Sequence, residues 1–145
     1  MPSVSDQAIR LVIAGVLLLH GLGHGGALGA LIWLRLRPAS NAGGWLDARS
    51  WLAPGLPSTT AEFAAGAFWV VSMVGFVGAV VALFLVPGDA WRVLAVDTAF
   101  VSTIGIVLFL GTWPLFNTLA ALAVNVAVLV ALLWLHWPPE AMFGT

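Results

Sequence analysis

Four stretches of this sequence are long and apolar enough to cross a lipid bilayer, because a membrane-spanning helix needs about 20 mostly apolar residues. Hydrophobic residues make up 61% of the chain and charged residues 8%, whereas a soluble globular domain is about 45–50% apolar and about 25% charged. A water-soluble core of this size cannot bury that surplus, so we predict a single transmembrane domain over residues 1–145. The spans are expected at about 8–34, 61–86, 90–110 and 115–137.

Short connections follow the second and third predicted spans, where Pro and Gly residues end the apolar runs at 87–89 and 111–114. Because loops this short join antiparallel neighbours, we predict an all-α, up-down four-helix bundle. The longer connection, 35–60, contains Trp45 and Trp51, and Trp favours the headgroup region of a bilayer. We expect either a short helix lying at this interface or an ordinary loop that these two side chains anchor.

We predict a multi-pass protein of the cell membrane, and its charged residues bear on its orientation and on its partners. Positive-inside counting favours the cytoplasm for the 35–60 connection, because it carries three of the five arginines. The net charge of −1 provides no basic patch for phosphates and argues against nucleic acid as a partner. Tryptophans at the ends of the spans indicate an aromatic belt: they are Trp33, Trp91, Trp113, Trp134 and Trp137.

The first predicted span contains the stretch LLLHGLGHGGALG, which places two histidines inside an otherwise apolar helix. His20 and His24 are four residues apart and therefore share one helix face. Gly21, Gly25 and Gly29 have the same spacing, so we predict a helix-packing groove where a neighbouring helix or a flat ligand can approach the backbone. The two imidazoles either donate hydrogen bonds to carbonyl groups of a neighbouring helix or bind a ligand.

Two kinds of ligand fit this spacing of His20 and His24. A divalent metal ion could be held by both side chains, as in helical zinc sites, although the stretch lacks the glutamate of the HExxH motif. A haem or chlorin ring could instead lie against the glycines and take one histidine as its axial ligand.

Polar residues of other spans lie at the same depth as these histidines. When the spans are aligned by their midpoints at about 1.5 Å per residue, His20, Asp97 and Asn125 fall within about one turn of each other. Lipid offers no hydrogen-bond partner, so each of these side chains is expected to face the interior. We predict a cofactor-binding cluster of His20, His24, Asp97 and Asn125. In it, Asp97 contacts His20 directly or through one water and orients its imidazole.

Other polar side chains have structural explanations. The hydroxyl groups of Ser102 and Thr103 are expected to bond to carbonyl groups of their own helix. Glu62 lies near the loop end of the second span, and we expect it to pair with an arginine at the same interface. The candidate partners are Arg35, Arg37 and Arg49.

Two stretches resemble the DoxX-like family of small four-helix membrane proteins. The first helix of that family commonly ends an apolar run with a His-Gly pair, as in LLLHGL at 17–22. Its second helix commonly opens with a Glu followed by glycines, as in AEFAAG at 61–66. The residues that carry the resemblance are His20, Gly21, Glu62 and Gly66, whereas His24 and the repeated glycines fall outside the pattern. The resemblance implies a four-helix membrane fold among redox or sulfur-oxidising partners, or a chaperone-like role.

Three functions are compatible with these residues. The first is a non-catalytic membrane subunit that packs against partner chains of a larger redox complex, or against a second copy of itself. The second is a small enzyme, or a protein that binds a cofactor, a quinone or a metal, with His20, His24 and Asp97 at its centre. The third is a proton-coupled transporter, which four helices without an internal inverted repeat make the least favoured. The residues leave open whether the chain is an enzyme.

Overall fold

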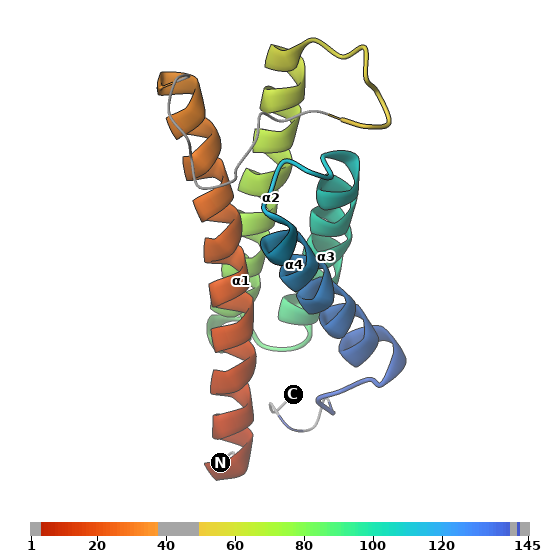
Figure 1. The fold of residues 1–145 in the computed structure, drawn as a ribbon. Coiled ribbons are helices and arrows are strands. Elements are labelled where there is room, and N and C mark those ends of the chain that lie inside the picture. The colour runs from red at the N-terminus through yellow and green to blue at the C-terminus, as the bar shows by residue number, and fades with distance from the viewer. Residues whose placement is uncertain (1–3, 38–49, 140–141, 143–145) are drawn as a thin grey trace.

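The computed structural model describes residues 4–37, 50–139 and 142. This part of the chain contains no strand, only four α-helices and a short π-helix. The elements are α1 (Val4–Leu36), α2 (Ser58–Leu85), α3 (Ala90–Leu108), α4 (Leu115–Leu129) and η1 (Val130–Trp134). Successive helices run in opposite directions and pack beside one another, α1 on α2, α2 on α3 and α3 on α4 (Figure 1). The predicted all-α, up-down four-helix bundle is confirmed.

All four helices are long and apolar enough to cross a membrane, the fourth being α4 continued by η1, so the chain is a multi-pass membrane protein. Helix α2 ends one residue before the predicted end, α3 two residues before it, and the fourth span three residues before it. Helix α3 ends because Phe109 leaves the helical range, with φ −114° and ψ 38°, and Gly111 follows with a φ of 92°. The fourth span ends at Trp134, before the left-handed φ of 47° at His136.

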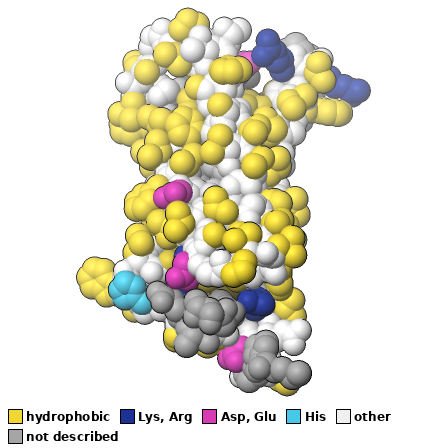
Figure 2. Space-filling view, turned by 180° about the vertical axis from the view of Figure 1, so that it is seen from behind, with side chains coloured by type: hydrophobic (Ala, Val, Ile, Leu, Met, Phe, Trp, Pro, Cys, Tyr) yellow, Lys and Arg dark blue, Asp and Glu magenta, His cyan; other side chains and the backbone are white. Residues whose placement is uncertain are grey.

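Hydrophobic side chains cover the outside of the bundle, and Figure 2 shows them over the middle of one face, with basic side chains near its ends. At one end Glu62 Oε2 lies 3.8 Å from Arg35 Nη1, and Arg35 is one of the three arginines considered for it. The Arg37 guanidinium lies instead over the Trp33 ring, 4.3 Å from its centroid. Arg49 lies outside the described residues.

The described part of the long connection, residues 50–57, forms bends and a turn. No interfacial helix is present in this part, and Trp45 lies outside the described residues. Trp51 donates a hydrogen bond from Nε1 to the carbonyl oxygen of Val107, at a distance of 2.6 Å. The Trp51 indole therefore ties the connection to the end of α3.

Two glycines of the predicted groove lie against α2. A Cβ atom added at Gly21 would lie 3.1 Å from Phe76 Cβ, and one added at Gly25 would lie 2.8 Å from Met73 Sδ. An added Cβ at Gly29 would meet no atom within 4 Å. The close contact between α1 and α2 therefore involves Gly21 and Gly25 and does not extend to Gly29.

Two further glycines, outside the predicted groove, bring α2 and α3 together. A Cβ atom at Gly75 would overlap the side chain of Thr98, and one at Gly105 would lie 2.8 Å from Phe68 Cβ. Small residues at such positions let two helix backbones approach closely in a membrane, where close van der Waals packing drives helix association.

The interior contains two apolar clusters, one toward each end of the bundle, with a layer of polar side chains between them. The first cluster includes Leu17 and Phe76, and the second includes Ala27 and Trp69. Each helix contributes one buried polar side chain between its residues of the two clusters, and we call these four the polar layer. Its members are His24, Ser72, Ser102 and Asn125.

Candidate functional site

Hydrogen bonds join three helices across the polar layer. On one side, His20 Nε2 lies 2.8 Å from Asn125 Oδ1. On the other, Asn125 Nδ2 lies 2.8 Å from Ser102 Oγ, which lies 2.9 Å from His24 Nε2. These four residues form a continuous chain from α1 through α4 and α3 back to α1, which we call the polar chain. The fourth member of the layer, Ser72, bonds to a carbonyl group of its own helix instead.

The chemistry of the Asn125 carboxamide fixes the direction of two of the three hydrogen bonds. A carboxamide oxygen only accepts, so the proton of His20 lies on Nε2. Ser102 Oγ accepts from the Asn125 amide, and its second lone pair and its own proton leave it able either to accept from Nε2 of His24 or to donate to it. When the Ser102 hydroxyl donates, Nε2 of His24 is the acceptor and a neutral His24 carries its proton on Nδ1. In that tautomer the polar chain runs in one direction, from His20 to His24.

The Nδ1 atom of His24 is left over at the end of this chain. The His24 side chain is only 1% exposed, and its Nδ1 atom has no hydrogen-bond partner among the described residues. A buried donor without an acceptor costs about 1–3 kcal/mol. The Phe76 ring stacks on the imidazole at 6.2 Å and the Trp113 ring packs against it at 5.3 Å. These contacts hold the imidazole in place, so the unpartnered Nδ1 atom is a feature of the site that needs an explanation.

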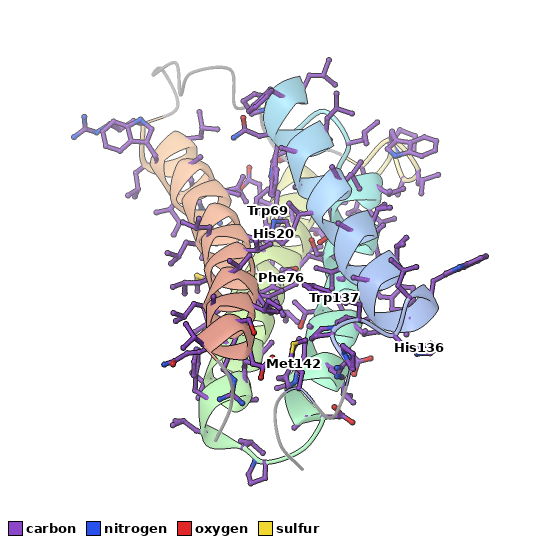
Figure 3. The ribbon with its side chains drawn as sticks, turned by 90° about the horizontal axis from the view of Figure 1, so that it is seen from below. His20, Trp69, Phe76, His136, Trp137 and Met142 are labelled. Atoms are coloured by element: carbon purple, nitrogen blue, oxygen red, sulfur yellow. The ribbon has the colours of Figure 1, made fainter. Side chains whose placement is uncertain are left out.

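Both histidines line a groove of about 620 Å³ between α1 and α4, which we call the lateral groove. It exists because α1 packs mainly on α2 and α4 mainly on α3, so that these two helices stay apart. Leu19 and Phe116 on its sides are strongly exposed, so the groove opens toward lipid. In Figure 3, His20 lies in the interior between α1 and the other helices, near Trp69 and Phe76.

Helical periodicity explains why these side chains meet. The buried residues of α1 recur every three or four positions, and His24 belongs to that stripe, whereas His20 lies at its edge. On α4 the buried stripe includes Asn125. The two stripes are Ala14, Leu17, Gly21, His24 and Ala27 on α1, and Thr118, Ala121, Asn125 and Val128 on α4.

The predicted inward position of Asp97 is wrong. The buried stripe of α3 includes Thr98, Ser102 and Gly105. Asp97 precedes Ser102 by five residues, which is about 140° around a helix of 3.6 residues per turn, so the two side chains point in nearly opposite directions. Asp97 is exposed, and His20 bonds to Asn125 instead of contacting it.

The predicted pairing of Ser102 with its own helix is also wrong, because its hydroxyl group belongs to the polar chain. Thr103 follows the prediction, and its Oγ1 donates to the carbonyl oxygen of Ala99 at 2.7 Å. The difference follows from position: Ser102 faces the bundle interior, whereas Thr103 lies at the side of α3.

The geometry of the histidines bears on the metal and tetrapyrrole hypotheses. The two rings meet edge to face, with centroids 4.9 Å apart, and both Nε2 atoms are in hydrogen bonds with protein groups. A metal ion bound through either Nε2 would have to displace Asn125 or Ser102. Within the described residues, no group of three or more His, Cys, Asp or Glu could hold a metal ion. His136 is exposed and lies far from His20 (Figure 3).

Trp113 is a site residue that the sequence pattern assigned to the aromatic belt, and that assignment is wrong. The Trp113 side chain is only 9% exposed and packs between His24 and Trp69, whose ring centroid lies 5.6 Å away. Trp113 lies in the turn between α3 and α4, where no helical periodicity marks it as buried.

Comparison with known proteins finds no family model that matches this chain, no matching curated protein and no matching solved structure. Membership of the DoxX-like family therefore stays a prediction. Of the residues that carry that resemblance, His20 lines the lateral groove and Gly21 packs on α2, whereas Glu62 lies near Arg35.

Proposed function

We propose that this chain binds a lipophilic molecule of the quinone class in the lateral groove. The observation that carries the proposal is the buried Nδ1 atom of His24, which has no hydrogen-bond partner among the described residues and belongs to a side chain that lines the groove. A quinone carbonyl oxygen accepts hydrogen bonds and donates none, so it complements this donor. We assign to His24 the tautomer in which Nε2 accepts from the Ser102 hydroxyl and Nδ1 donates to the ligand.

The shape of the lateral groove also suits a flat ring. Its volume of about 620 Å³ is within the range of about 300–1,000 Å³ that is common for small-molecule sites. Gly23 and Gly26 line it and leave open space where side chains would stand. Trp113 and Phe116 supply aromatic surface against which a ring can stack with an offset. A molecule enters this groove from the bilayer, where quinones are dissolved.

A quinone fits the histidines better than a metal ion or an iron-ligated haem does. Coordination through Nε2 of either histidine would break the polar chain, and it would leave buried polar groups without partners. Nδ1 of His24 could also ligate a metal ion, but no group of three or more His, Cys, Asp or Glu among the described residues gathers there to complete such a site. A carbonyl oxygen that reaches Nδ1 of His24, after a shift of the side chains that cover this atom, preserves every hydrogen bond of the chain and adds one.

Equilibrium binding of a decyl-substituted benzoquinone to the purified protein in lipid nanodiscs tests this proposal. We expect saturable binding, and we expect His24→Phe to weaken it about two- to tenfold, because a neutral hydrogen bond contributes about 0.5–1.5 kcal/mol. The control is His136→Asn, which changes the exposed histidine and keeps a residue that tolerates a positive φ. Absence of saturable binding to the wild-type protein would refute the proposal.

A second pair of variants tests the groove without disturbing the polar chain. Gly26 lines the groove and Gly29 does not, and a Cβ atom at either position meets no atom within 4 Å. We expect Gly26→Leu to fill the groove and weaken quinone binding more than tenfold, with both variants folding normally. Equal binding by Gly26→Leu and Gly29→Leu would place the quinone elsewhere.

A second candidate function is that of a non-catalytic subunit in a larger membrane complex, and the exposed Asp97 favours it. Asp97 lies seven residues after Ala90, about 10 Å into the span. None of the described residues forms an ion pair or a hydrogen bond with its carboxylate. Insertion of a charged residue at the centre of a membrane helix costs about 2.5–3.5 kcal/mol, and a partner helix with a basic side chain would offset that cost.

Blue native electrophoresis of membranes solubilised in a mild detergent tests the subunit role. We expect the wild-type chain to migrate within a larger assembly and Asp97→Leu to migrate at the size of the isolated protein. Val93→Leu, on the same exposed face of α3, is the control. A wild-type chain that migrates alone, or an assembly that survives Asp97→Leu, would remove the support that Asp97 gives.

A further inference from the structure

We propose that the molecule bound in the lateral groove carries a hydrocarbon tail, and that this tail lies in a second cavity between α1 and α4. The inference rests on the proposed function and specifies the ligand further. The second cavity has a volume of about 200 Å³ and only hydrophobic residues line it. A water molecule needs two to four polar partners, so a cavity lined in this way is suited to hydrocarbon.

The two cavities lie along one seam, by which we mean the gap between α1 and α4, and they share two lining residues. Val16 on α1 and Val124 on α4 line both the lateral groove and the second cavity. A molecule whose ring reaches His24 can therefore extend past these two valines without leaving the space between the helices. The polar end of the seam offers a hydrogen-bond donor, and the other end offers hydrophobic surface alone. This sequence of surfaces matches a molecule with a polar ring and an apolar chain.

The residues of α4 and η1 keep the seam open. Four residues recur along this face at spacings of four, three and four, and each lines at least one of the two cavities: Ala120, Val124, Ala127 and Ala131. From Ala120 to Ala131 the path covers about 16 Å at 1.5 Å per residue. Small residues along this face leave room for a chain.

The π-helix contributes directly to the second cavity. Ala131, within η1, is one of its lining residues, as are Trp137 and Pro138, which follow η1 in the chain. Short π-helical segments in helices are frequent at functional sites, because they change the direction of the side chains that follow. Here the segment lies at the end of the seam that is farthest from His24.

Binding of two probes separates the tail site from the ring site. One probe is tetramethylbenzoquinone, which has no tail, and the other is decyl-substituted benzoquinone. In nanodiscs of one lipid composition, with concentrations expressed relative to lipid, we expect the wild-type protein to bind the tailed probe at least fivefold more tightly. This preference comes from packing of the tail, because the lipid phase is as apolar as the cavity.

The decisive variant is Ala127→Phe, which fills the second cavity, with Val126→Phe as the control, because Val126 is exposed about 100° around α4 from Ala127 and lines neither cavity. We expect Ala127→Phe to weaken binding of the tailed probe at least fivefold and to change binding of the tailless probe less than twofold. Unchanged binding of the tailed probe would overturn the tail site and leave the proposed function intact, and the cavity would then accommodate a lipid chain unrelated to the ligand. Equal weakening of both probes would also overturn it. Failure of the wild-type protein to bind either probe would refute the proposed function itself.

Discussion

The Ser102 hydroxyl group on α3 lies 2.9 Å from Nε2 of His24 on α1, although 78 residues separate them in the sequence. Asn125 on α4 bonds to both Ser102 and His20, so one carboxamide completes the connection between three helices. Hydrogen bonds between membrane helices contribute about 0.6 kcal/mol on average. Their greater effect here is on register, because rotation of α3 by one residue would turn Ser102 away from both partners.

We predict that Asn125→Leu lowers the free energy of unfolding by about 1–3 kcal/mol, because it leaves the buried donor of His20 without an acceptor. Reversible unfolding in mixed micelles, followed by circular dichroism, measures this change. Thr103→Val is the control, since Thr103 bonds only within its own helix, and we expect a change below about 0.5 kcal/mol. Equal stability of Asn125→Leu and the wild-type protein would show that the polar chain does not support the bundle.

We predict that Gly75→Ala destabilises the protein by about 1–3 kcal/mol, because the added methyl group would overlap the branched side chain of Thr98. Gly78→Ala on the same helix is the control, where an added Cβ meets no atom within 4 Å and a small gain in stability is expected. The second substitution Thr98→Ala should restore much of the stability lost in Gly75→Ala. Thermal unfolding of the wild-type protein, Gly75→Ala, Gly78→Ala and the double variant in one detergent measures these differences in stability. A Gly75→Ala protein as stable as Gly78→Ala would contradict the close packing.

We predict that Glu62→Gln changes the unfolding free energy by less than about 1 kcal/mol. The Glu62 carboxylate lies 3.8 Å from the Arg35 guanidinium, and the Arg35 side chain is 67% exposed, so solvent and salt weaken the pair. The measurement is unfolding at low and at high salt, and the small effect should shrink further at high salt. A loss of several kcal/mol would mean that Glu62 has a structural role beyond this pair.

Much of the fold could be predicted because its strongest determinant is local. The length of each apolar run sets the spans, and short connections at 87–89 and 111–114 force antiparallel neighbours. The separation of α1 from α4 could not be predicted in this way. It depends on how each helix packs on α2 or α3, and on contacts such as that between Gly75 and Thr98, which join residues far apart in the sequence.

The candidate site, too, was predictable only in part. Depth along each span brought His20, His24 and Asn125 to the same level, and the structure joins them through Ser102. Depth alone misplaced Asp97, because a side chain at the right height can still point away from the bundle. The positions of the small residues around α3 indicate that Asp97 faces outward, because the buried stripe that contains Ser102 does not include Asp97. Neither depth along a span nor helical periodicity identifies a buried residue in a turn. Neither criterion therefore identifies Trp113 as a residue of the site.

The carbonyl stretching frequency of a bound, ¹³C-labelled quinone tests most directly whether His24 donates a hydrogen bond to a ligand in the lateral groove. Infrared difference spectra of the wild-type protein in nanodiscs should show one carbonyl band shifted to lower wavenumber than in lipid alone. The same band should return toward its position in lipid in His24→Phe and stay shifted in His136→Asn. An unshifted carbonyl in the wild-type protein, or an equal shift in His24→Phe, would contradict the account.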